Sequence, residues 1–202
     1  MQYICSYCST QFYYHRSAKH CSVSCAVLGR IKRQNDSITT ENGICLLPLR
    51  LNKFAQFDSE DLELVRQSLW RLQVTKYPEK FYVVSGAHPR IILLHRVLTE
   101  APKNKYIDHA NGDGLDNSRK NIRVCTPSQN GMNREGYGSS SFKGVYKSNG
   151  GKDRWKASIQ HKNKQYHLGC FGSKEAAALA YDERAKELFG KFALLNFPVS
   201  QT

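Results

Sequence analysis

The sequence predicts an α+β chain built from small modules rather than one large domain, and three observations carry this prediction. Only 40% of its 202 residues are apolar, which is little for a single large core. Two close cysteine pairs lie near the N-terminus, a strand-turn-strand-helix pattern lies in the centre, and three strand-like runs precede one helix in the C-terminal part. We therefore divide the chain into modules at 1–35, at 40–134 with a core at 104–134, and at 141–198.

The net charge of +13 predicts a polyanionic partner. Basic and acidic residues number 5 and 1 in residues 1–40, 14 and 11 in 41–141, and 11 and 5 in 142–202. The excess charge lies at both ends, which we expect to bind the polyanion around a nearly balanced centre. No run approaches the roughly 18 apolar residues of a membrane span, and the N-terminus has no signal-peptide core. We therefore expect a soluble, intracellular monomer without membrane contact.

The first module is predicted to bind one zinc ion. It carries two close cysteine pairs, Cys5 with Cys8 and Cys21 with Cys25. Each pair supplies two thiolates from one turn, and four thiolates complete a tetrahedral zinc site. His20 is an alternative ligand, although a surface histidine is the simpler interpretation. In a reducing compartment disulfides are rare, so Cys45 and Cys125, which have no partner nearby in the sequence, are expected to be buried thiols.

The stretch before the centre combines strands with one helix. Residues 44–49 are typical of an edge strand, because their proline cannot donate to a strand ladder. A helix is predicted to begin at 57–61, where acidic residues favour a helix N-terminus, and to run to a buried Trp70. Further strands are expected at 81–84 and 91–94. His95 is interpreted as a packed, hydrogen-bonded histidine in preference to a site residue.

The centre has the pattern of a short strand, a turn, a second strand and a helix. The first strand, residues 106–109, ends in an Asp-His pair, and a turn with two glycines follows. The second strand is expected at 121–124. Thr126 is the expected N-cap of a helix with a proline in its first turn. The acidic and amide residues at 113–117 are interpreted mostly as residues that stabilise turns.

Four side chains of this centre suit phosphodiester hydrolysis. Asp108 offers a hard anionic oxygen for Mg²⁺ or Mn²⁺, and Asn130 near the helix start offers a second, neutral oxygen. His109 is a candidate general base near neutral pH. Asn121 is a candidate to orient the imidazole, as groups behind metal ligands orient histidines. This set could activate water and neutralise charge at a phosphate.

The same residues resemble an HNH endonuclease of the phage homing type. The resemblance rests on Asp108-His109, Asn111-Gly112, Asn117, the run 121–126 and Gln129-Asn130, with a lead-in at 58–70 and 94–96. It implies a ββα-metal fold, also called the His-Me finger, with Asp108 and Asn130 as metal ligands, His109 as general base and Asn121 as its positioning residue. The third motif position is asparagine rather than histidine, which implies an oxygen-rich site with one metal ion. The resemblance also implies a cytoplasmic location, in a bacterium or in the host of a phage.

The C-terminal module is predicted to be a three-stranded antiparallel sheet packed on one helix. Strand-like runs lie at 142–147, 154–159 and 165–169, with hairpin turns at Gly150-Gly151 and 162–164 and a linker at 136–141. Ser173 is the expected N-cap of the helix, whose small residues allow close packing on the sheet. Basic and aromatic residues interleave in the strands, so we expect one basic face that enters a DNA major groove.

This segment resembles the ethylene-response-factor (APETALA-two) DNA-binding domain of plants. The matches are Lys143-Gly144-Val145, Trp155-Lys156-Ala157, Leu168-Gly169 with Phe171, Glu175-Ala176-Ala177, Ala180-Tyr181-Asp182 and Leu195-Asn196-Phe197-Pro198. The resemblance implies that five residues face double-stranded DNA: Lys143, Lys147, Arg154, Trp155 and Lys156. Tyr166-His167 stand where the plant pattern prefers tryptophan, so the resemblance does not fix a base preference.

The sequence thus predicts a site-directed DNA endonuclease that hydrolyses phosphodiester bonds with Mg²⁺ or Mn²⁺ and carries structural zinc. Whether it nicks one strand or cuts both is left open. The alternative from another class is a non-catalytic, sequence-specific DNA-binding regulator whose centre has only a structural role. The complete set of four polar residues in the centre favours the enzyme. A structure-specific or RNA-directed nuclease is a third alternative, which the DNA-type C-terminal segment disfavours.

Overall fold

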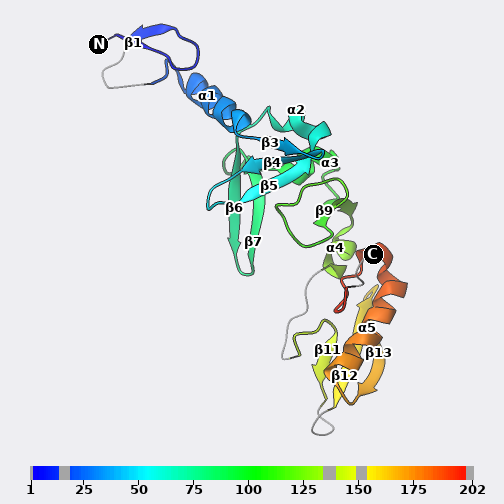
Figure 1. The fold of residues 1–202 in the computed structure, drawn as a ribbon. Helices are drawn as coiled ribbons and strands as arrows, with labels where there is room; N and C mark the ends of the chain where they lie inside the picture. Colours follow the sequence, from blue (N-terminus) through cyan, green and yellow to red (C-terminus); the bar gives the residue numbers. More distant parts are fainter. Residues whose placement is uncertain (1, 14–18, 134–139, 149–153, 199–202) are drawn as a thin grey trace. The chain divides into compact units, whose positions relative to one another are not determined.

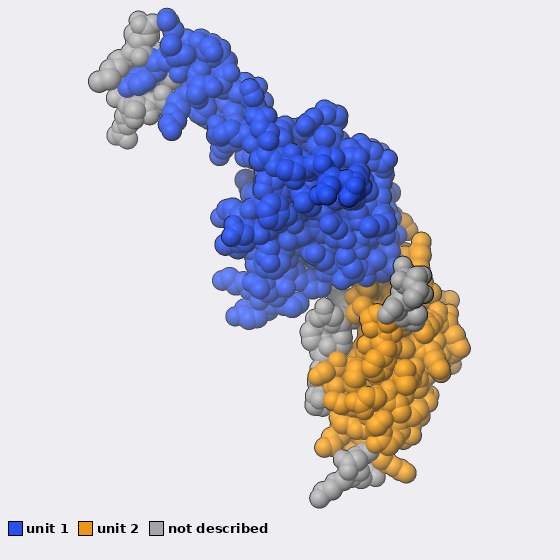
Figure 2. Space-filling view, viewed as in Figure 1, with its two compact units in different colours: residues 1–103, 109–124 blue, residues 104–108, 125–202 orange. Residues whose placement is uncertain are grey.

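A computed structural model of the chain describes residues 2–13, 19–133, 140–148 and 154–198 (Figure 1). The chain forms two compact units, residues 1–103 with 109–124, and residues 104–108 with 125–202 (Figure 2). Helices and several small antiparallel sheets confirm the α+β class. The division into three modules stays a prediction. No helix in the described ranges is long and apolar enough to cross a membrane.

The first unit begins with a small sheet and a helix. Their elements are β1 (Gln2–Ile4), paired with β2 (Gln11–Tyr13), and α1 (Val23–Asp36). The Ser22 hydroxyl caps α1 by accepting a hydrogen bond from the Cys25 N–H at 3.1 Å. Near the other end of the helix, the Gln34 side chain bonds the N–H and the C=O of Trp70 at 2.9 and 2.8 Å. These two bonds fix α1 to the sheet that begins at Trp70.

Two three-stranded antiparallel sheets follow in this unit. The first contains β3 (Thr39–Glu41), β4 (Ile44–Pro48) and β5 (Phe54–Asp58), and the second contains β6 (Trp70–Lys76), β7 (Glu79–Ser85) and β8 (Ile92–Leu93). Because β4 is the central strand of its sheet, the prediction of an edge strand at 44–49 was wrong. Pro48 is tolerated because β3 pairs with β4 only as far as Leu46, so Pro48 pairs with β5 alone.

Short helices connect these sheets to the centre of the chain. They are the 3₁₀ turn η1 (Ser59–Asp61), α2 (Leu62–Val65) and α3 (Leu94–Thr99). The predicted helix from 57–61 to Trp70 was wrong in its extent, since it ends at Val65 and Trp70 begins β6. Trp70 pairs with Ser85, and its indole N–H donates to the Val65 C=O at 2.7 Å. Strand pairing at Trp70 therefore outweighs the helical spacing of the apolar residues before it. Trp70 is buried, as predicted. The strand expected at 91–94 is also shorter, because α3 begins at Leu94.

The predicted strand-strand-helix order is present in the centre. Its elements are β9 (Tyr106–His109), β10 (Ile122–Cys125), which shares a two-stranded sheet with β9, and α4 (Pro127–Met132). Thr126 caps α4 as predicted. Its hydroxyl accepts from the Gln129 N–H at 3.2 Å, and the Gln129 side chain accepts from the Thr126 N–H at 2.8 Å. This reciprocal capping box explains why the helix begins where it does.

In the second unit, one helix covers one face of a three-stranded antiparallel sheet (Figure 1). The elements are β11 (Val145–Lys147), β12 (Trp155–His161), β13 (Lys164–Phe171), α5 (Lys174–Phe189) and the 3₁₀ turn η2 (Gly190–Phe192). Lys162 and Asn163 both have positive φ, which a tight hairpin turn needs. Ser173 caps α5 as predicted. The expected turn at Gly150-Gly151 and residues 136–139 of the expected linker lie outside the described residues.

Candidate functional site

The predicted catalytic pair, Asp108 and His109, ends strand β9, and both residues are buried, each with 6% of its surface exposed. Successive side chains of a strand point to opposite faces. The histidine side and the carboxylate side of the site therefore have separate surroundings.

The imidazole of His109 lies in a small aromatic cluster of the first unit. The centre of the His95 ring is 5.0 Å from that of His109, at an interplanar angle of 68°, and the Tyr82 ring centre is 6.3 Å from both. Burial lowers the pKa of His95 from 6.5 to about 3, and the charges of His109 and Arg96 add to the shift. His95 is thus a neutral, packed histidine near pH 7. The sequence did not show that it packs against His109.

Asn121 fixes the loop that follows His109. Its Oδ1 accepts a hydrogen bond from the Asn111 N–H at 2.9 Å, and its Nδ2 donates to the C=O of Asp116 at 2.7 Å. Its backbone C=O accepts from the Ala110 N–H at 2.9 Å. The structure therefore brings Asn121 beside the backbone next to His109, and the amide restrains the loop that leads away from the imidazole.

Asp116 and Arg119 tie the same loop to the body of the first unit. Asp116 forms an isolated bridge with Gln56 of β5 and accepts from the Ser118 hydroxyl at 2.6 Å. Burial opposes the ionisation of Asp116, but hydrogen bonds from Ser118 and Gln56 outweigh it and lower the pKa of the carboxyl.

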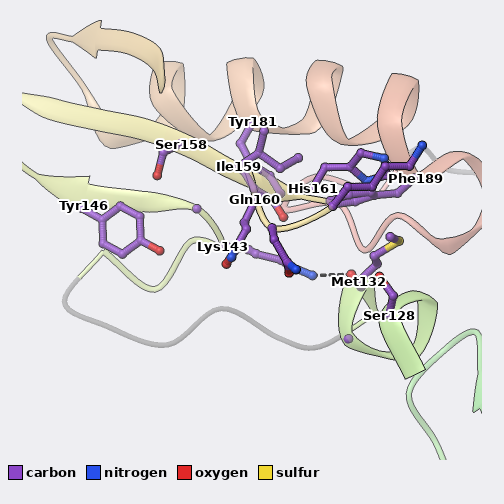
Figure 3. A pocket seen from close by; sticks show the side chains of 14 residues that line it. Ser128, Met132, Lys143, Tyr146, Ser158, Ile159, Gln160, His161, Tyr181 and Phe189 are labelled. Carbon is purple, nitrogen blue, oxygen red and sulfur yellow. Dashed lines mark hydrogen bonds between the residues drawn. The ribbon is translucent and has the colours of Figure 1, made fainter. Parts of the chain in front are cut away.

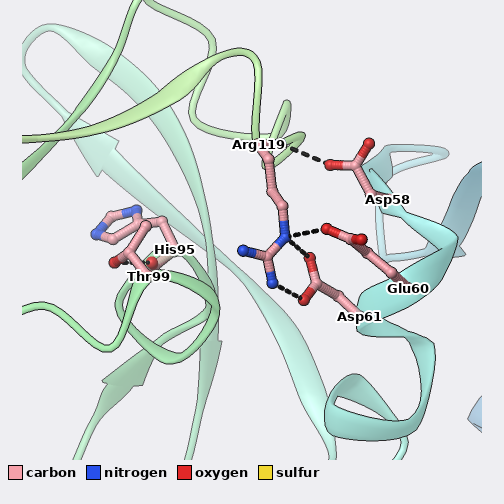
Figure 4. A network of polar contacts seen from close by, with 6 residues as sticks. All are labelled: Asp58, Glu60, Asp61, His95, Thr99 and Arg119. Carbon is pink, nitrogen blue, oxygen red and sulfur yellow. Dashed lines mark hydrogen bonds and ion pairs between the residues drawn. The ribbon is translucent and has the colours of Figure 1, made fainter.

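Arg119 faces three carboxylates, those of Asp58, Glu60 and Asp61 (Figure 4). Its N–H donates to Asp58 at 2.6 Å, and its guanidinium reaches Glu60 at 2.5 Å and Asp61 at 2.6 Å. Asp61 is almost fully buried, with 3% exposed. The acidic residues predicted to begin a helix are thus the partners of an arginine about sixty positions away in the chain.

On the carboxylate side, Asp108 lies beside the C-terminal end of α4. The Nδ2 of Asn133, which ends that helix, donates to Asp108 Oδ1 at 2.9 Å. The predicted second ligand, Asn130, lies within α4 and is half-buried. Carboxylate and amide oxygens are the donors that a hard divalent cation prefers, so these residue types fit Mg²⁺ or Mn²⁺. Asn133 was missed by the sequence analysis, although its spacing of three from Asn130 was a signal for one helix face.

The four N-terminal cysteines form a cluster that could hold a metal ion. The Sγ atoms of Cys5, Cys8, Cys21 and Cys25 all lie within 4.8 Å of one another. A hydrogen bond from the Cys8 backbone lowers the pKa of the Cys5 thiol to about 5, whereas the thiols of Cys25 and Cys8 raise that of Cys21 to about 12. A bound dication favours the thiolate form of its cysteine ligands. Cys45 and Cys125 are buried, as predicted.

The residues predicted to face DNA lie in different surroundings. Lys156 belongs to a shallow hollow on the sheet, whose other lining residues are Tyr146, Ser158, Gln165 and His167. Lys147 and Arg154 are exposed near strand ends. Trp155 packs against the core cluster between sheet and α5. Lys143 is half-buried, and its amine donates to a backbone carbonyl of α4. The hollow therefore contains Lys156 from the predicted set, whereas Lys143 and Trp155 are engaged within the module.

Comparison with known proteins finds relatives that match different parts of the chain. A family model described as HNH endonuclease matches residues 93–132. An uncharacterized HNH endonuclease of Acanthamoeba polyphaga mimivirus is 30% identical over 143 residues, which cover 71% of this chain and 74% of the relative. Dehydration-responsive element-binding protein 2E of Oryza sativa subsp. japonica is 46% identical over 59 residues, covering 28% of this chain and 18% of the relative. Dehydration-responsive element-binding protein 2A of Arabidopsis thaliana is 45% identical over 62 residues, covering 30% and 18%. The chain belongs to the HNH endonuclease family and combines its nuclease motif with a segment similar to APETALA-two-type DNA-binding proteins.

Proposed function

We propose that the protein is a site-directed DNA endonuclease that hydrolyses phosphodiester bonds with one divalent ion, Mg²⁺ or Mn²⁺. The observation that carries the proposal is the position of Asp108 and His109 at the end of β9, inside the segment matched by the HNH family. Asn121 precedes the next strand and Asn130 lies in the helix that follows it. Similarity to plant proteins named dehydration-responsive element-binding proteins supports double-stranded DNA as the partner.

In the proposed reaction, His109 accepts the proton of the attacking water. Asn121 keeps the following loop in place, so that the imidazole stays oriented. Asp108 and Asn130 hold the divalent ion, and Asn133 supports the Asp108 carboxylate by its hydrogen bond. When bound, the ion neutralises phosphate charge and stabilises the leaving oxygen.

The two ends of the chain have binding roles in this proposal. The cysteine cluster holds one structural zinc ion, for which four thiolates are a suitable set. Lys147, Arg154 and Lys156 are exposed and are proposed to contact DNA phosphates or bases. Direct DNA contacts by Lys143 and Trp155 stay predictions.

The test is divalent-dependent cleavage of DNA by the full chain, compared with the His109→Ala variant. We expect wild-type protein to cleave with Mg²⁺ or Mn²⁺ and the variant to lose about a hundredfold or more in rate, the range for a lost general base. His88→Ala is the matched control, because His88 is exposed in the same unit and should leave the rate unchanged. Normal cleavage by His109→Ala would refute the catalytic assignment. DNA binding without any cleavage by the wild type would favour the regulator instead.

A further inference from the structure

Lys143 precedes β11 in the C-terminal module, and its side chain reaches the helix of the nuclease motif. Its Nζ donates a hydrogen bond to the backbone C=O of Met132, the last residue of α4 (Figure 3). A groove of about 410 Å³ opens at this place, and residues of α4 and of the sheet line it. The Lys143 amine is therefore directed along the groove to α4.

Met132 makes a second connection between α4 and the C-terminal module. Its side chain packs against a buried cluster that consists of Ile159, Tyr181, Ala185 and Phe189. None of the residues of α4 is itself buried, so an isolated helix of this length would be marginal in water. The packing of Met132 and the bond from Lys143 hold the helix end against the module.

The chemistry of a helix end explains why a lysine suits this place. The last carbonyls of a helix have no partner within the helix, and a cation near them is favourable. Burial lowers the pKa of Lys143 to about 8, so the amine is still mostly charged near pH 7. A lysine that is half-buried and bonded to this carbonyl is already engaged without DNA.

The backbone of Lys143 is also held in place. Its N–H donates to Asn196 Oδ1 at 2.6 Å, and its C=O accepts from Asn196 Nδ2 at 3.1 Å. Asn196 in turn donates to the buried carboxylate of Asp182 in α5 at 3.0 Å through Nδ2. The next residue, Gly144, has φ of +74°, and a Cβ there would lie 2.0 Å from the Tyr181 ring. A series of hydrogen bonds thus connects α5 through Asn196 and Lys143 to α4.

We propose that Lys143 is a positioning residue for the nuclease reaction, which fixes the end of α4, and with it Asn130, on the DNA-binding module. The assignment of Asn130 as a metal ligand rests on the proposed function. In this arrangement the module that binds DNA also sets the position of one metal ligand and of Asn133, which supports the other. The connection by Lys143 is made in the DNA-free protein.

The experiment compares Lys143→Met, Lys143→Arg and Lys156→Met in the full chain. Methionine keeps most of the volume of Lys143 but cannot donate, whereas arginine can still donate to a carbonyl. Hydrogen exchange of the α4 amides measures the connection without any need for cleavage. The Asn130 N–H, which donates to the Thr126 C=O at 2.9 Å, is a suitable reporter. We expect exchange there to be about tenfold faster in Lys143→Met, as loss of one charge-assisted hydrogen bond predicts, and restored towards wild type in Lys143→Arg.

Cleavage kinetics provide the second measurement. Lys143→Met should lower kcat about tenfold and raise the Mn²⁺ concentration for half-maximal rate, while affinity for DNA stays within about twofold. Lys156→Met is the matched control: it should weaken DNA binding and reduce the salt slope by about one without changing α4 exchange.

Two outcomes overturn the proposal. If α4 exchange is unchanged in Lys143→Met, no such connection exists, whether or not the protein cleaves DNA. If Lys143→Met behaves as Lys156→Met, with weaker binding, a smaller salt slope and unchanged kcat, Lys143 is a DNA contact instead. A wild-type protein that does not cleave, but whose α4 exchange responds to Lys143→Met, would refute the proposed function and keep the connection.

Discussion

At the residue scale, the buried amide of Asn121 is stabilised by hydrogen bonds to polar groups of the loop after His109. Asn121 is 5% exposed, and both atoms of its amide bond the backbone of the loop after His109. Removing such a side chain leaves buried backbone groups without that partner, which costs about 1–3 kcal/mol. The burial of this asparagine is therefore evidence for a positioning role, independent of the family motif.

The first prediction concerns this amide. Asn121→Ala should lower the free energy of unfolding by about 1–3 kcal/mol, because the Asn111 N–H and the Asp116 C=O lose their partner. Asn121→Asp keeps the acceptor but places a carboxylate oxygen against the Asp116 C=O, so it should also lower the free energy of unfolding. Urea unfolding of the three proteins measures the effect. Equal stability of wild type and Asn121→Ala would show that the loop does not depend on this residue.

The second prediction concerns His95 and pH. The pKa of about 3 for His95 in the folded protein lies below the ordinary value of 6.5. As the pH falls, His95 therefore binds a proton in the unfolded chain before it does so in the folded protein. The stability that the neutral His95 contributes to the folded state is fully present above pH 6.5. It is lost as the pH falls towards 3, at about 1.4 kcal/mol per pH unit. As the pH falls from 7 to 5, the free energy of unfolding of the wild type should therefore decrease relative to that of His95→Leu. Unfolding curves at both values test this, and a constant difference would contradict it.

At the same scale, sequence reasoning found residues that share a local motif and missed those brought together by the fold. Asp108, His109 and Asn121 lie within one strand-turn-strand pattern, so their neighbourhood could be predicted. His95 comes from α3, outside that pattern, and its packing against the His109 imidazole depends on tertiary structure. Spacing alone could not show that contact.

At the element scale, the short helical segment after β5 shows why its extent could not be predicted. The spacing of its apolar residues favoured a helix up to Trp70, but that residue pairs in β6 with Ser85. The acidic residues at its start were read as helix-terminal charges. Glu60 and Asp61 form ion pairs with Arg119, which a local pattern cannot reveal. Caps, in contrast, are local, and the caps at Thr126 and Ser173 were predicted correctly.

The third prediction concerns Arg119, which joins the loop before β10 to η1. Arg119→Ala should destabilise the first unit by about 1–3 kcal/mol, because the buried Asp61 loses its charged partner. Lys120→Ala is the control, since Lys120 is exposed and adjacent. Thermal unfolding of both variants measures the difference. Matching melting temperatures would indicate that the network of carboxylates contributes nothing to stability.

The fourth prediction concerns the N-terminal cysteine cluster. Purified without chelator, the chain should contain one zinc ion, and Cys25→Ser should lower its zinc affinity strongly because one of four thiolates is lost. Cys170→Ser, at an exposed cysteine outside the cluster, is the control. Metal analysis by mass spectrometry provides the measurement. Protein without zinc, or equal zinc in both variants, would refute the site.

At the scale of the whole molecule, the basic residues in excess and the residues of the nuclease motif lie in different parts of the chain. The excess of basic residues lies in the two ends, whereas the residues of the nuclease motif lie in a nearly balanced centre. The sequence showed this distribution directly. It could not show that α4 is bonded and packed to the C-terminal module, because those contacts join segments on either side of the linker. Binding and cleavage are therefore expected to depend on each other.

We propose that this chain cuts DNA at selected sites with His109 as the general base. The most direct test is the mapping of strand breaks in a DNA library incubated with the full chain and Mn²⁺ or Mg²⁺. We expect breaks at a recurring sequence, on one strand or on both, that disappear with His109→Ala. DNA that is bound but left uncut by the wild type, or breaks that persist unchanged with the variant, would contradict this proposal.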